Sequence, residues 1–320
     1  MDERHALESI GAWLPAAGDD AAVVGTNVLT TDMLHASTDF PAGVNKYTAG
    51  WRSVGASLSD VAAMGAEAAA AVAVYAAPEF DERELSDFLA GASDVCQAVG
   101  AEYVGGDLDT HEEFTVSTTA LGRVDSPVRR SGAMPGDRVF VTGTLGRSAL
   151  ALSLFEAGET NGSDGGGRND DESDDSESDG RNGDEREDST IERANDLFRF
   201  TPRVAAGVAL GSHASAMMDI SDGLARSLHQ LATASDCGFE IESPLPIDDR
   251  LFERFDSGEA RYRGTTFGED FELLITVPES AIDAAEARSL PVEVTEVGRV
   301  VTEGISFDGE GLPDRGYTHG

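Results

Sequence analysis

Six short segments place carboxylates directly beside apolar runs, and this arrangement limits the folds open to the chain. A bare carboxylate next to a buried strand is costly unless it is paired with a cation or bound to a metal. A suitable fold must therefore gather these acids where they can be neutralised. The segments are Gly18-Asp19-Asp20, Thr30-Thr31-Asp32, Ser59-Asp60, Gly105-Gly106-Asp107, Asp219-Ile220-Ser221-Asp222-Gly223 and Gly268-Glu269-Asp270.

Each segment taken alone is an ordinary helix cap or turn, because Asp and Gly are common in both. Their joint occurrence indicates something more. Mg²⁺ takes oxygen ligands and usually holds one or two carboxylates together with phosphate oxygens. Five or six such loops around one cleft therefore predict several Mg²⁺ ions and a bound polyphosphate.

Helix and strand patterns alternate along the chain, which predicts an α/β fold. The first half reads as strand, strand, helix, strand, helix, strand, strand and ends near Val124: Val23–Val24, Val28–Thr31, Asn45–Met64, Ala69–Ala76, Glu82–Val99, Glu102–Val104 and Phe114–Leu121. In the second half we expect helices at 145–157, 191–210 and Leu224–Ala234, and strands at Arg138–Thr142, Ala216–Ile220, Gly238–Ile241, Phe271–Val277 and Val292–Val301. We predict two domains, 1–125 and 126–320.

Residues 158–190 contain no hydrophobic residue and carry a net charge of −10, so we expect a disordered acidic insertion in the second domain. The whole chain has 60 Asp and Glu against 23 Lys and Arg, a formal charge of −37, and Lys46 is its only lysine. The −27 outside the insertion fits a protein that works in concentrated salt, where charge repulsion is screened.

The same charge argues against binding to nucleic acid or to an anionic membrane, because both would be repelled. No apolar run is long enough to span a membrane, and the N-terminus lacks a signal-peptide pattern, so we expect a cytoplasmic protein. The chain has no phosphate-binding loop with its Gly-Lys pair, no Gly-x-Ser-x-Gly elbow and no zinc spacing among its six His.

The motifs together resemble the thiamine-monophosphate kinases, in the superfamily that includes aminoimidazole ribonucleotide synthetase and selenophosphate synthetase. The resemblance covers nearly the whole chain except 158–190. It rests on strings that occur in order: Ala17-Gly18-Asp19-Asp20-Ala21, Thr31-Asp32, Leu58-Ser59-Asp60-Val61-Ala62-Ala63-Met64-Gly65, Gly105-Gly106-Asp107, Arg130-Ser131-Gly132, Pro135-Gly136-Asp137, Asp219-Ile220-Ser221-Asp222-Gly223-Leu224 and Gly268-Glu269-Asp270-Phe271-Glu272-Leu273.

The resemblance implies a two-domain synthetase-like fold whose N-terminal domains pair in a homodimer with a barrel-like core. It implies ATP-dependent phosphorylation of thiamine monophosphate to thiamine diphosphate, assisted by Mg²⁺. The implied metal ligands are Asp20, Thr30, Thr31, Asp32, Asp60, Asp107, Asp219 and Asp222. Tyr103, Gly106, Arg130 and Ser221 would contact ATP, and Glu269 and Tyr317 would contact the thiamine part.

Asp32, Asp107, Asp222 and Arg130 are the expected catalytic residues, since phosphoryl transfer mainly needs alignment and neutralised charge. The family commonly has a His seven residues after the Asp of its Thr-Asp motif, and this chain has Asp39 there. Either His35 substitutes for that His or Asp39 faces the cationic ring, and we assign Asp39 to the substrate site. Two alternatives stay open. One is another synthetase of the superfamily, such as an aminoimidazole ribonucleotide synthetase, and the other is a non-catalytic nucleotide- or metal-binding protein.

The acidic composition generates a first prediction. Dialysis from molar KCl to low salt should lower the melting temperature and the activity, because unscreened repulsion then opposes compaction. The Debye length grows from ~3 Å at ~1 M salt to ~10 Å at ~0.1 M. Thermal melts at the two salt concentrations test this, and an unchanged melting temperature would contradict it.

Overall fold

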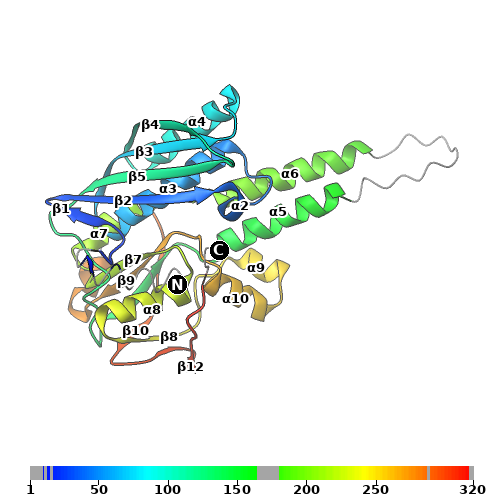
Figure 1. Ribbon diagram of the computed structural model, residues 1–320. Coiled ribbons are helices and arrows are strands. Elements are labelled where there is room, and N and C mark those ends of the chain that lie inside the picture. The colour runs from blue at the N-terminus through cyan, green and yellow to red at the C-terminus, as the bar shows by residue number, and fades with distance from the viewer. Residues whose placement is uncertain (1–9, 11–12, 15–16, 164–179, 287–288, 317–320) are drawn as a thin grey trace, which may run out of the picture.

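The computed structural model describes residues 10, 13–14, 17–163, 180–286 and 289–316, with the backbone alone for 159–163 and 180–188. Two β-sheets form its body, each with helices against it, and a pair of long helices extends away from them (Figure 1). The expected mixed α/β fold in two parts is confirmed. The exact domain limits stay a prediction.

The N-terminal sheet has five strands in the order β1-β2-β5-β3-β4. All neighbours are antiparallel except β3 and β4, which run parallel. The sheet is open, and the described residues of one chain form no closed barrel. The strands are β1 (Ala22–Val24), β2 (Asn27–His35), β3 (Glu67–Ala77), β4 (Glu102–Thr110) and β5 (Thr115–Arg123).

Helices α3 (Lys46–Ala63) and α4 (Glu82–Ala98) cover one face of this sheet, and the one-turn helix α2 (Ala36–Asp39) follows β2 (Figure 1). Asn45, where the predicted helix begins, caps α3, since its side chain accepts a hydrogen bond from the Thr48 N–H at 2.8 Å. The helix stops where Gly65 takes a left-handed φ of 66°.

Two glycines let α3 and α4 approach closely. A Cβ on Gly50 would lie 2.1 Å from the Phe88 carbonyl oxygen, and one on Gly91 would lie 1.9 Å from that of Tyr47. Any larger residue at either position would push the helices apart. This close packing fixes α3, which carries several of the candidate site residues.

The second sheet has seven strands in the order β12-β11-β8-β10-β6-β9-β7. Neighbours are antiparallel except β8 and β11, which run parallel. Its strands are β6 (Arg138–Thr142), β7 (Ala216–Ile220), β8 (Gly238–Ile241), β9 (Glu272–Val277), β10 (Val294–Val301), β11 (Ile305–Phe307) and β12 (Glu310–Gly311). The bounds of β6, β7 and β8 are those expected from the sequence.

The helical segments of this half are α5 (Arg147–Ser163), α6 (Gly180–Phe198), α7 (Val204–Gly211), α8 (Leu224–Ser235), α9 (Asp249–Arg254), α10 (Ser257–Thr266), the 3₁₀ turn η2 (Glu279–Ala281) and α11 (Ile282–Glu286). The two halves share a buried core in which Ala62 and Ala63 of α3 contact Val204 and Leu210 of α7 and Met217 of β7. Helix α3 therefore packs against the N-terminal sheet and also against the second half of the chain.

The expectation of disorder over 158–190 is wrong at both ends of that range, because α5 continues to Ser163 and α6 begins at Gly180. The two helices lie side by side as one hairpin (Figure 1). Once a helix is nucleated by packed residues, each added residue costs little, so polar sequence can extend it. Residues 164–179 lie outside the described part of the chain.

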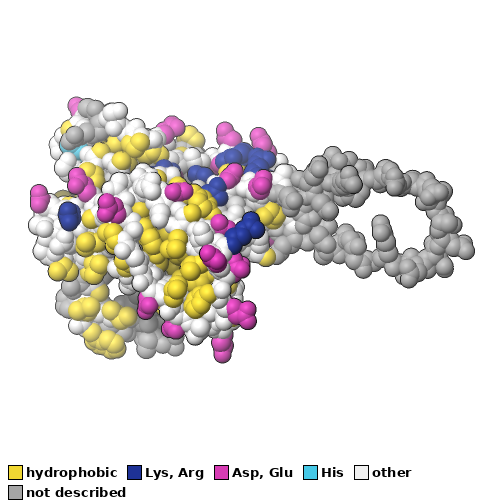
Figure 2. All heavy atoms as spheres, turned by 90° about the horizontal axis from the view of Figure 1, so that it is seen from above, with side chains coloured by type: hydrophobic (Ala, Val, Ile, Leu, Met, Phe, Trp, Pro, Cys, Tyr) yellow, Lys and Arg dark blue, Asp and Glu magenta, His cyan; other side chains and the backbone are white. Residues whose placement is uncertain are grey.

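Acidic side chains spread over the face shown in Figure 2, with hydrophobic side chains between them and Lys and Arg side chains gathered near the base of the hairpin. Within the described residues, no helix is both long and apolar enough to cross a membrane.

The base of the hairpin is tied to α3 through a buried amide, which generates a second prediction. The Asn195 Oδ1 accepts a hydrogen bond from the Asn45 N–H at 3.1 Å, and its Nδ2 donates to the Gly43 carbonyl at 2.9 Å. Asn195→Ala should lower the free energy of unfolding by ~1–3 kcal/mol, because buried polar groups lose their partners. Denaturant titration in molar KCl measures this.

A matched control is Asn27→Ala, since the Asn27 side chain donates only a surface hydrogen bond of 3.4 Å to Val24. This variant should stay within ~0.5 kcal/mol of the parent protein. Equal losses in the two variants would contradict the structural role of Asn195.

Candidate active site

Three carboxylates from distant parts of the sequence meet where the two layers join. Asp20 precedes β1, Asp60 lies in the last turn of α3, and Asp219 lies on β7. One carboxylate oxygen of each lies within 4.8 Å of the others. Asp20 and Asp219 are buried. We call these three residues the acid cluster.

Burial and mutual repulsion make the acid cluster hard to ionise. Burial, followed by the charges of Asp32, Asp219 and Asp20, raises the pKa of Asp60 well above its usual range. Burial and the charge of Asp20 raise the pKa of Asp219 to about 8. Burial also raises the pKa of Asp32. Carboxylates placed so close together cannot all be charged at neutral pH without added cations.

Hydroxyl groups orient the carboxylates. The Ser59 hydroxyl donates to Asp219 at 2.8 Å, and the Ser57 hydroxyl donates to Asp32 at 2.6 Å. The Thr30 hydroxyl donates to Asp60. Each hydrogen bond fixes one oxygen of an acid and leaves the other available. Such a set of fixed, closely spaced oxygens fits a hard divalent cation.

Arg130 is the cation that the chain itself supplies at this point. Its Nη2 and Nε donate to the two carboxylate oxygens of Asp20 at 2.8 and 3.2 Å. Burial alone would lower the pKa of Arg130, but the charges of Asp20, Asp219 and Asp60 more than compensate, so the guanidinium stays charged. One positive charge among several acids still leaves the site negative.

The alternation of strand β2 decides which of its residues reach the site. Thr30 and Asp32 lie on the face covered by α3, whereas Thr31 between them lies on the exposed face. The Thr31 hydroxyl donates to the Thr118 carbonyl at 2.8 Å. The structure therefore does not bring the Thr31 side chain to the acid cluster.

The Gly268-Glu269-Asp270 segment forms a turn in front of β9. Glu269 has a φ of 62°, a left-handed value that is rare for a residue with a side chain. Its N–H donates to the Ser221 carbonyl at 2.6 Å. Ser221 and Asp222 directly follow the last residue of β7, in the turn between β7 and α8, so this contact joins two of the predicted segments.

Asp270 has a structural role that the sequence did not separate from its neighbours. Its carboxylate accepts hydrogen bonds from the Gly146 and Ser148 N–H groups at 2.6 and 3.0 Å, at the beginning of α5. Burial raises the pKa of Asp270 to about 7. Asp270 thus caps the beginning of α5, whereas its neighbour Glu269 lines a cavity.

A cavity of about 210 Å³ brings the two predicted substrate acids together. Asp39 at the end of α2 and Glu269 both line it, with the rings of Phe198 and Phe267. Asp39 is held by the His35 N–H, which donates to its carboxylate at 2.7 Å. The combination of carboxylates and aromatic rings suits a cationic ring. The predicted contact Tyr317 lies outside the described residues.

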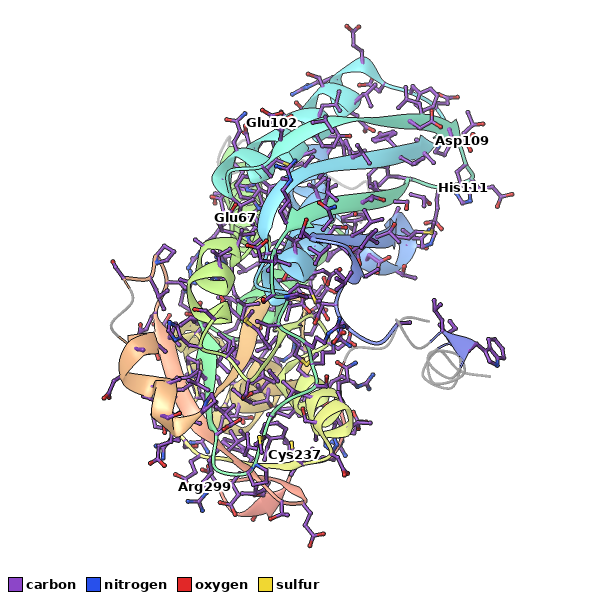
Figure 3. The ribbon with its side chains drawn as sticks, turned by 90° about the vertical axis from the view of Figure 1, so that its left-hand side faces the viewer. Glu67, Glu102, Asp109, His111, Cys237 and Arg299 are labelled. Carbon is purple, nitrogen blue, oxygen red and sulfur yellow. The ribbon has the colours of Figure 1, made fainter. Side chains whose placement is uncertain are left out.

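Three predicted site residues, Tyr103, Gly106 and Asp107, belong to strand β4 and lie away from the acid cluster and this cavity. Cα partners run across the sheet from Met33 through Ser117 and Val74 to Asp107, so Asp107 shares the face of Met33 and not that of Asp32. It is also three strand spacings from β2, roughly 14 Å. Figure 3 shows β4, between Glu102 and Asp109, at the end of the molecule remote from Cys237 and Arg299.

Tyr103 and Gly106 of the same strand line a separate cavity of about 390 Å³ with Leu85 and Phe88 of α4. Within one chain, therefore, the predicted ATP contacts fall into two groups. One group of Asp20, Arg130 and Ser221 lies at the acid cluster or beside it, and the other lies on β4.

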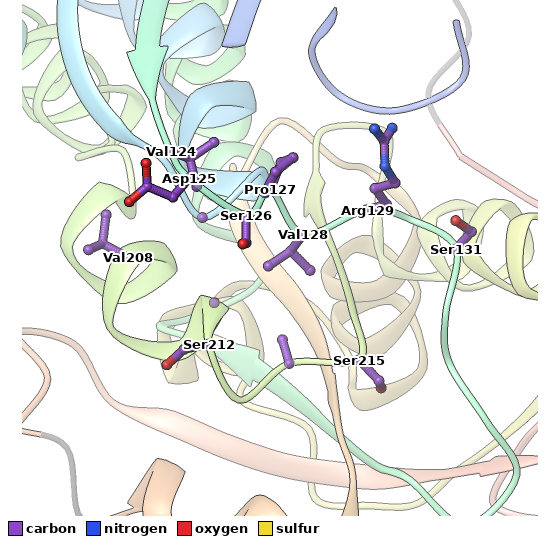
Figure 4. A pocket seen from close by; sticks show the side chains of 13 residues that line it. Val124, Asp125, Ser126, Pro127, Val128, Arg129, Ser131, Val208, Ser212 and Ser215 are labelled. Carbon is purple, nitrogen blue, oxygen red and sulfur yellow. The ribbon is translucent and has the colours of Figure 1, made fainter. Parts of the chain in front are cut away.

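A further cavity, of about 530 Å³, belongs to neither group. It lies between the linker from Val124 to Ser131 and the end of α7 with the residues after it (Figure 4). Most of its lining residues are small, four of the 13 are serines, and Arg129 is paired with Asp19. None of the predicted site residues lines it.

The sequence analysis missed Arg52, which is buried on α3 and forms an ion pair with Glu269. It also missed Ser57 and Ser59, which orient Asp32 and Asp219. A signal for Arg52 was present: it is the only charged residue between Lys46 and Asp60 in a helix of small and apolar residues.

Two family models match the chain. The model described as AIR synthase related protein, N-terminal domain, covers residues 18–124, and the model for the C-terminal domain of the same proteins covers residues 134–308. The chain is 56% identical over 322 residues to a thiamine-monophosphate kinase of Halobacterium salinarum, and the match covers 100% of both chains.

Solved structures are similar over nearly the whole chain. One, described as AaThiL complexed with AMPPCP and TMP, has a TM-score of 0.80 and 29% identity and covers 100% of this chain and 97% of its own. A thiamine-monophosphate kinase from Stenotrophomonas maltophilia has a TM-score of 0.74 and 31% identity, with 92% and 90% covered.

The acid cluster generates a third prediction, for the protein in the presence of a chelator. The pKa of Asp219 rises from 3.8 to about 8 on folding, so between these values the folded state binds more protons than the unfolded state. The free energy of unfolding should therefore fall as the pH rises through that window. Melting temperatures in molar KCl should drop between about pH 5 and about pH 8.

Asp219→Asn should remove much of this drop, since the variant has no charge to bury there. Asp109→Asn, on the exposed strand β4, changes the same charge at the surface and should leave the drop intact. If the parent protein and Asp219→Asn lose stability in parallel as the pH rises, the electrostatic account of the cluster is wrong.

Proposed function

The chain belongs to the thiamine-monophosphate kinases of the AIR synthase related family, and we propose that the cleft between its two sheets is where it performs their reaction. It transfers a phosphoryl group from ATP to thiamine monophosphate and releases thiamine diphosphate. The observation that carries the assignment of the cleft is the joint placement of the acid cluster and the Asp39–Glu269 cavity.

The thiamine part of the substrate would occupy the cavity lined by Asp39 and Glu269. The thiazolium ring is a cation, and it would lie between carboxylates and the rings of Phe198 and Phe267. Burial is the main cause of the raised pKa of Asp32, and the charge of Glu269 adds to it. A substrate seated here would therefore extend its phosphate toward Asp32 and the acid cluster.

The phosphate groups would meet over Asp20, Asp32, Asp60 and Asp219, which we assign to several Mg²⁺ ions. When bound there, Mg²⁺ would neutralise the phosphate oxygens that otherwise repel one another. Thr30 and Ser59 hold the carboxylates in place through their hydroxyl groups.

Arg130 would donate to the triphosphate of ATP, and Ser221 and Asp222 would complete the site from the next turn. The acceptor is already a phosphate oxygen, so the chain needs to align two anions and screen them, and it needs no strong base.

We assign the open face of the N-terminal sheet to a homodimer contact. Val24, Leu29, Met33 and Val74 are 39–61% exposed there, although strands are usually apolar only where they are covered. A second copy of the chain would cover this face, and the two sheets together would form the barrel-like core. Asp107 lies on the same face, which would bring it to the partner's cleft.

The dimer assignment generates a fourth prediction. If each active site uses Asp219 of one chain and Asp107 of the other, then Asp219→Asn and Asp107→Asn should each nearly abolish ADP release with ATP, Mg²⁺ and thiamine monophosphate in molar KCl. Refolding the two inactive variants together should restore about a quarter of the parent activity, because half of the dimers are then mixed and each mixed dimer has one intact site.

No recovery on mixing, with dimers present by light scattering, would contradict sharing of the site. A substrate panel in the same assay separates the family's chemistries. ADP release that depends on an aminoimidazole ribonucleotide precursor and not on thiamine monophosphate would favour a synthetase, and ATP binding without ADP release would favour a non-catalytic protein.

A further inference from the structure

Arg52 is a buried cation between the two halves of the molecule. It lies on α3 of the N-terminal half and its side chain is 1% exposed. Burying a guanidinium costs several kcal/mol unless it is paired and hydrogen-bonded. Burial lowers the pKa of Arg52, but the charges of Glu269, Asp270 and Asp39 oppose that effect. An arginine kept here must make specific contacts.

The hydrogen bonds of the Arg52 side chain go to residues of the second half of the chain. Nη1 donates to the Phe198 carbonyl at 2.6 Å, at the end of α6. Nη2 donates to the Glu269 carbonyl at 3.1 Å and also to the Glu269 carboxylate. The guanidinium carbon lies 3.6 Å from the centroid of the Phe198 ring. Arg52 therefore holds both the main chain and the side chain of Glu269.

The conformation of Glu269 needs such support. Glu269 and Phe271 both have left-handed φ values, 62° and 52°. This region is strained for residues with side chains, and they persist there only when their surroundings hold them. The Phe271 ring stacks on Phe200 with 4.2 Å between centroids, and Arg52 holds the other end of the turn.

The same contacts set the position and charge of the substrate cavity. Phe198 and Glu269, which Arg52 contacts, both line the cavity, and Asp39 lines it from the opposite element. Arg52 is not a lining residue of the cavity. Whatever it does for the substrate must therefore act through Phe198 and Glu269.

We propose that Arg52 is a positioning residue that sets the affinity for the thiamine part of the substrate by holding the Glu269 carboxylate and the Phe198 ring in the cavity. The proposal rests on the assignment of that cavity to thiamine monophosphate. A lysine cannot replace it fully, because the planar guanidinium reaches two carbonyls and a carboxylate at once, whereas an ammonium is a single point charge.

The experiment compares Arg52→Lys, Arg52→Met and Glu269→Gln with the parent protein in molar KCl. For Arg52→Met the KM for thiamine monophosphate should rise about ten- to hundredfold, the range for losing hydrogen bonds to a charged group. The KM for ATP should change less than about threefold, because the acid cluster keeps its own partners. The KM of Arg52→Lys for thiamine monophosphate should lie between those of the parent protein and Arg52→Met.

Direct binding of thiamine monophosphate by calorimetry without ATP provides a readout independent of turnover. The dissociation constant should follow the KM in each variant. Far-UV circular dichroism and melting temperatures report folding. If Arg52→Met does not fold, the graded response of Arg52→Lys still decides the question.

The double variant Arg52→Met/Glu269→Gln tests whether Arg52 acts through Glu269. Residues that act through one another are not additive, so the double variant should bind thiamine monophosphate about as weakly as the weaker single variant. Additive losses would overturn the proposal, and so would equal losses in the two KM values. If Glu269→Gln alone leaves thiamine monophosphate binding unchanged, the cavity assignment itself fails.

Arg199→Met is the matched control for loss of an arginine between the same elements. Arg199 Nη1 donates to the Thr48 hydroxyl at 2.9 Å, so it also joins α6 to α3, but it lines no part of the cavity. This variant should lower the melting temperature and leave both KM values within about twofold of the parent. A rise in the KM for thiamine monophosphate equal to that of Arg52→Met would assign the effect to general loosening and overturn the proposal.

Discussion

Repulsion between buried carboxylates is the constraint around which this molecule is organised. Asp20 comes from the segment before β1, Asp60 from α3 and Asp219 from β7, and one carboxylate oxygen of each lies within 4.8 Å of the others. Among the described residues, Arg130 supplies one positive charge to this group through its hydrogen bonds to Asp20. The surrounding hydroxyls fix the carboxylates but do not remove their charge. Under the proposed function, divalent cations from outside the chain would complete this site.

The cleft has two ends of different chemistry, and helix α3 links them. At one end Asp60 belongs to the acid cluster, which suits metal-bound phosphates. At the other end Arg52, two turns earlier on the same helix, holds Glu269 beside Asp39 and two aromatic rings. A substrate that is cationic at one end and anionic at the other can lie along this helix. The glycines that bring α3 close to α4 keep both ends at a fixed separation.

Local features were predictable from the sequence because local physics decides them. Asn45 caps a helix and Gly65 ends it through their own backbone and side-chain chemistry, and apolar runs gave strands β6, β7 and β8 their bounds. Long-range placement was less accessible. The side of β2 on which Thr31 lies depends on the phase of the strand, and the edge position of Asp107 depends on the strand order. Arg52 escaped notice because arginine in a helix is ordinarily solvated.

The contacts of Arg52 also bear on how the chain can be synthesised. Arg52 is separated from Glu269 by 217 residues along the chain, and Ser59 is separated from Asp219 by 160 residues. All five strands of the N-terminal sheet, by contrast, lie within the first 123 residues. During translation this sheet can therefore form early. The charged and polar residues of α3 that face the second half obtain their partners only when Asp219 and Glu269 have left the ribosome. Until the rest of the chain arrives, the carboxylates of that surface depend on ions from the surrounding solution to screen their repulsion.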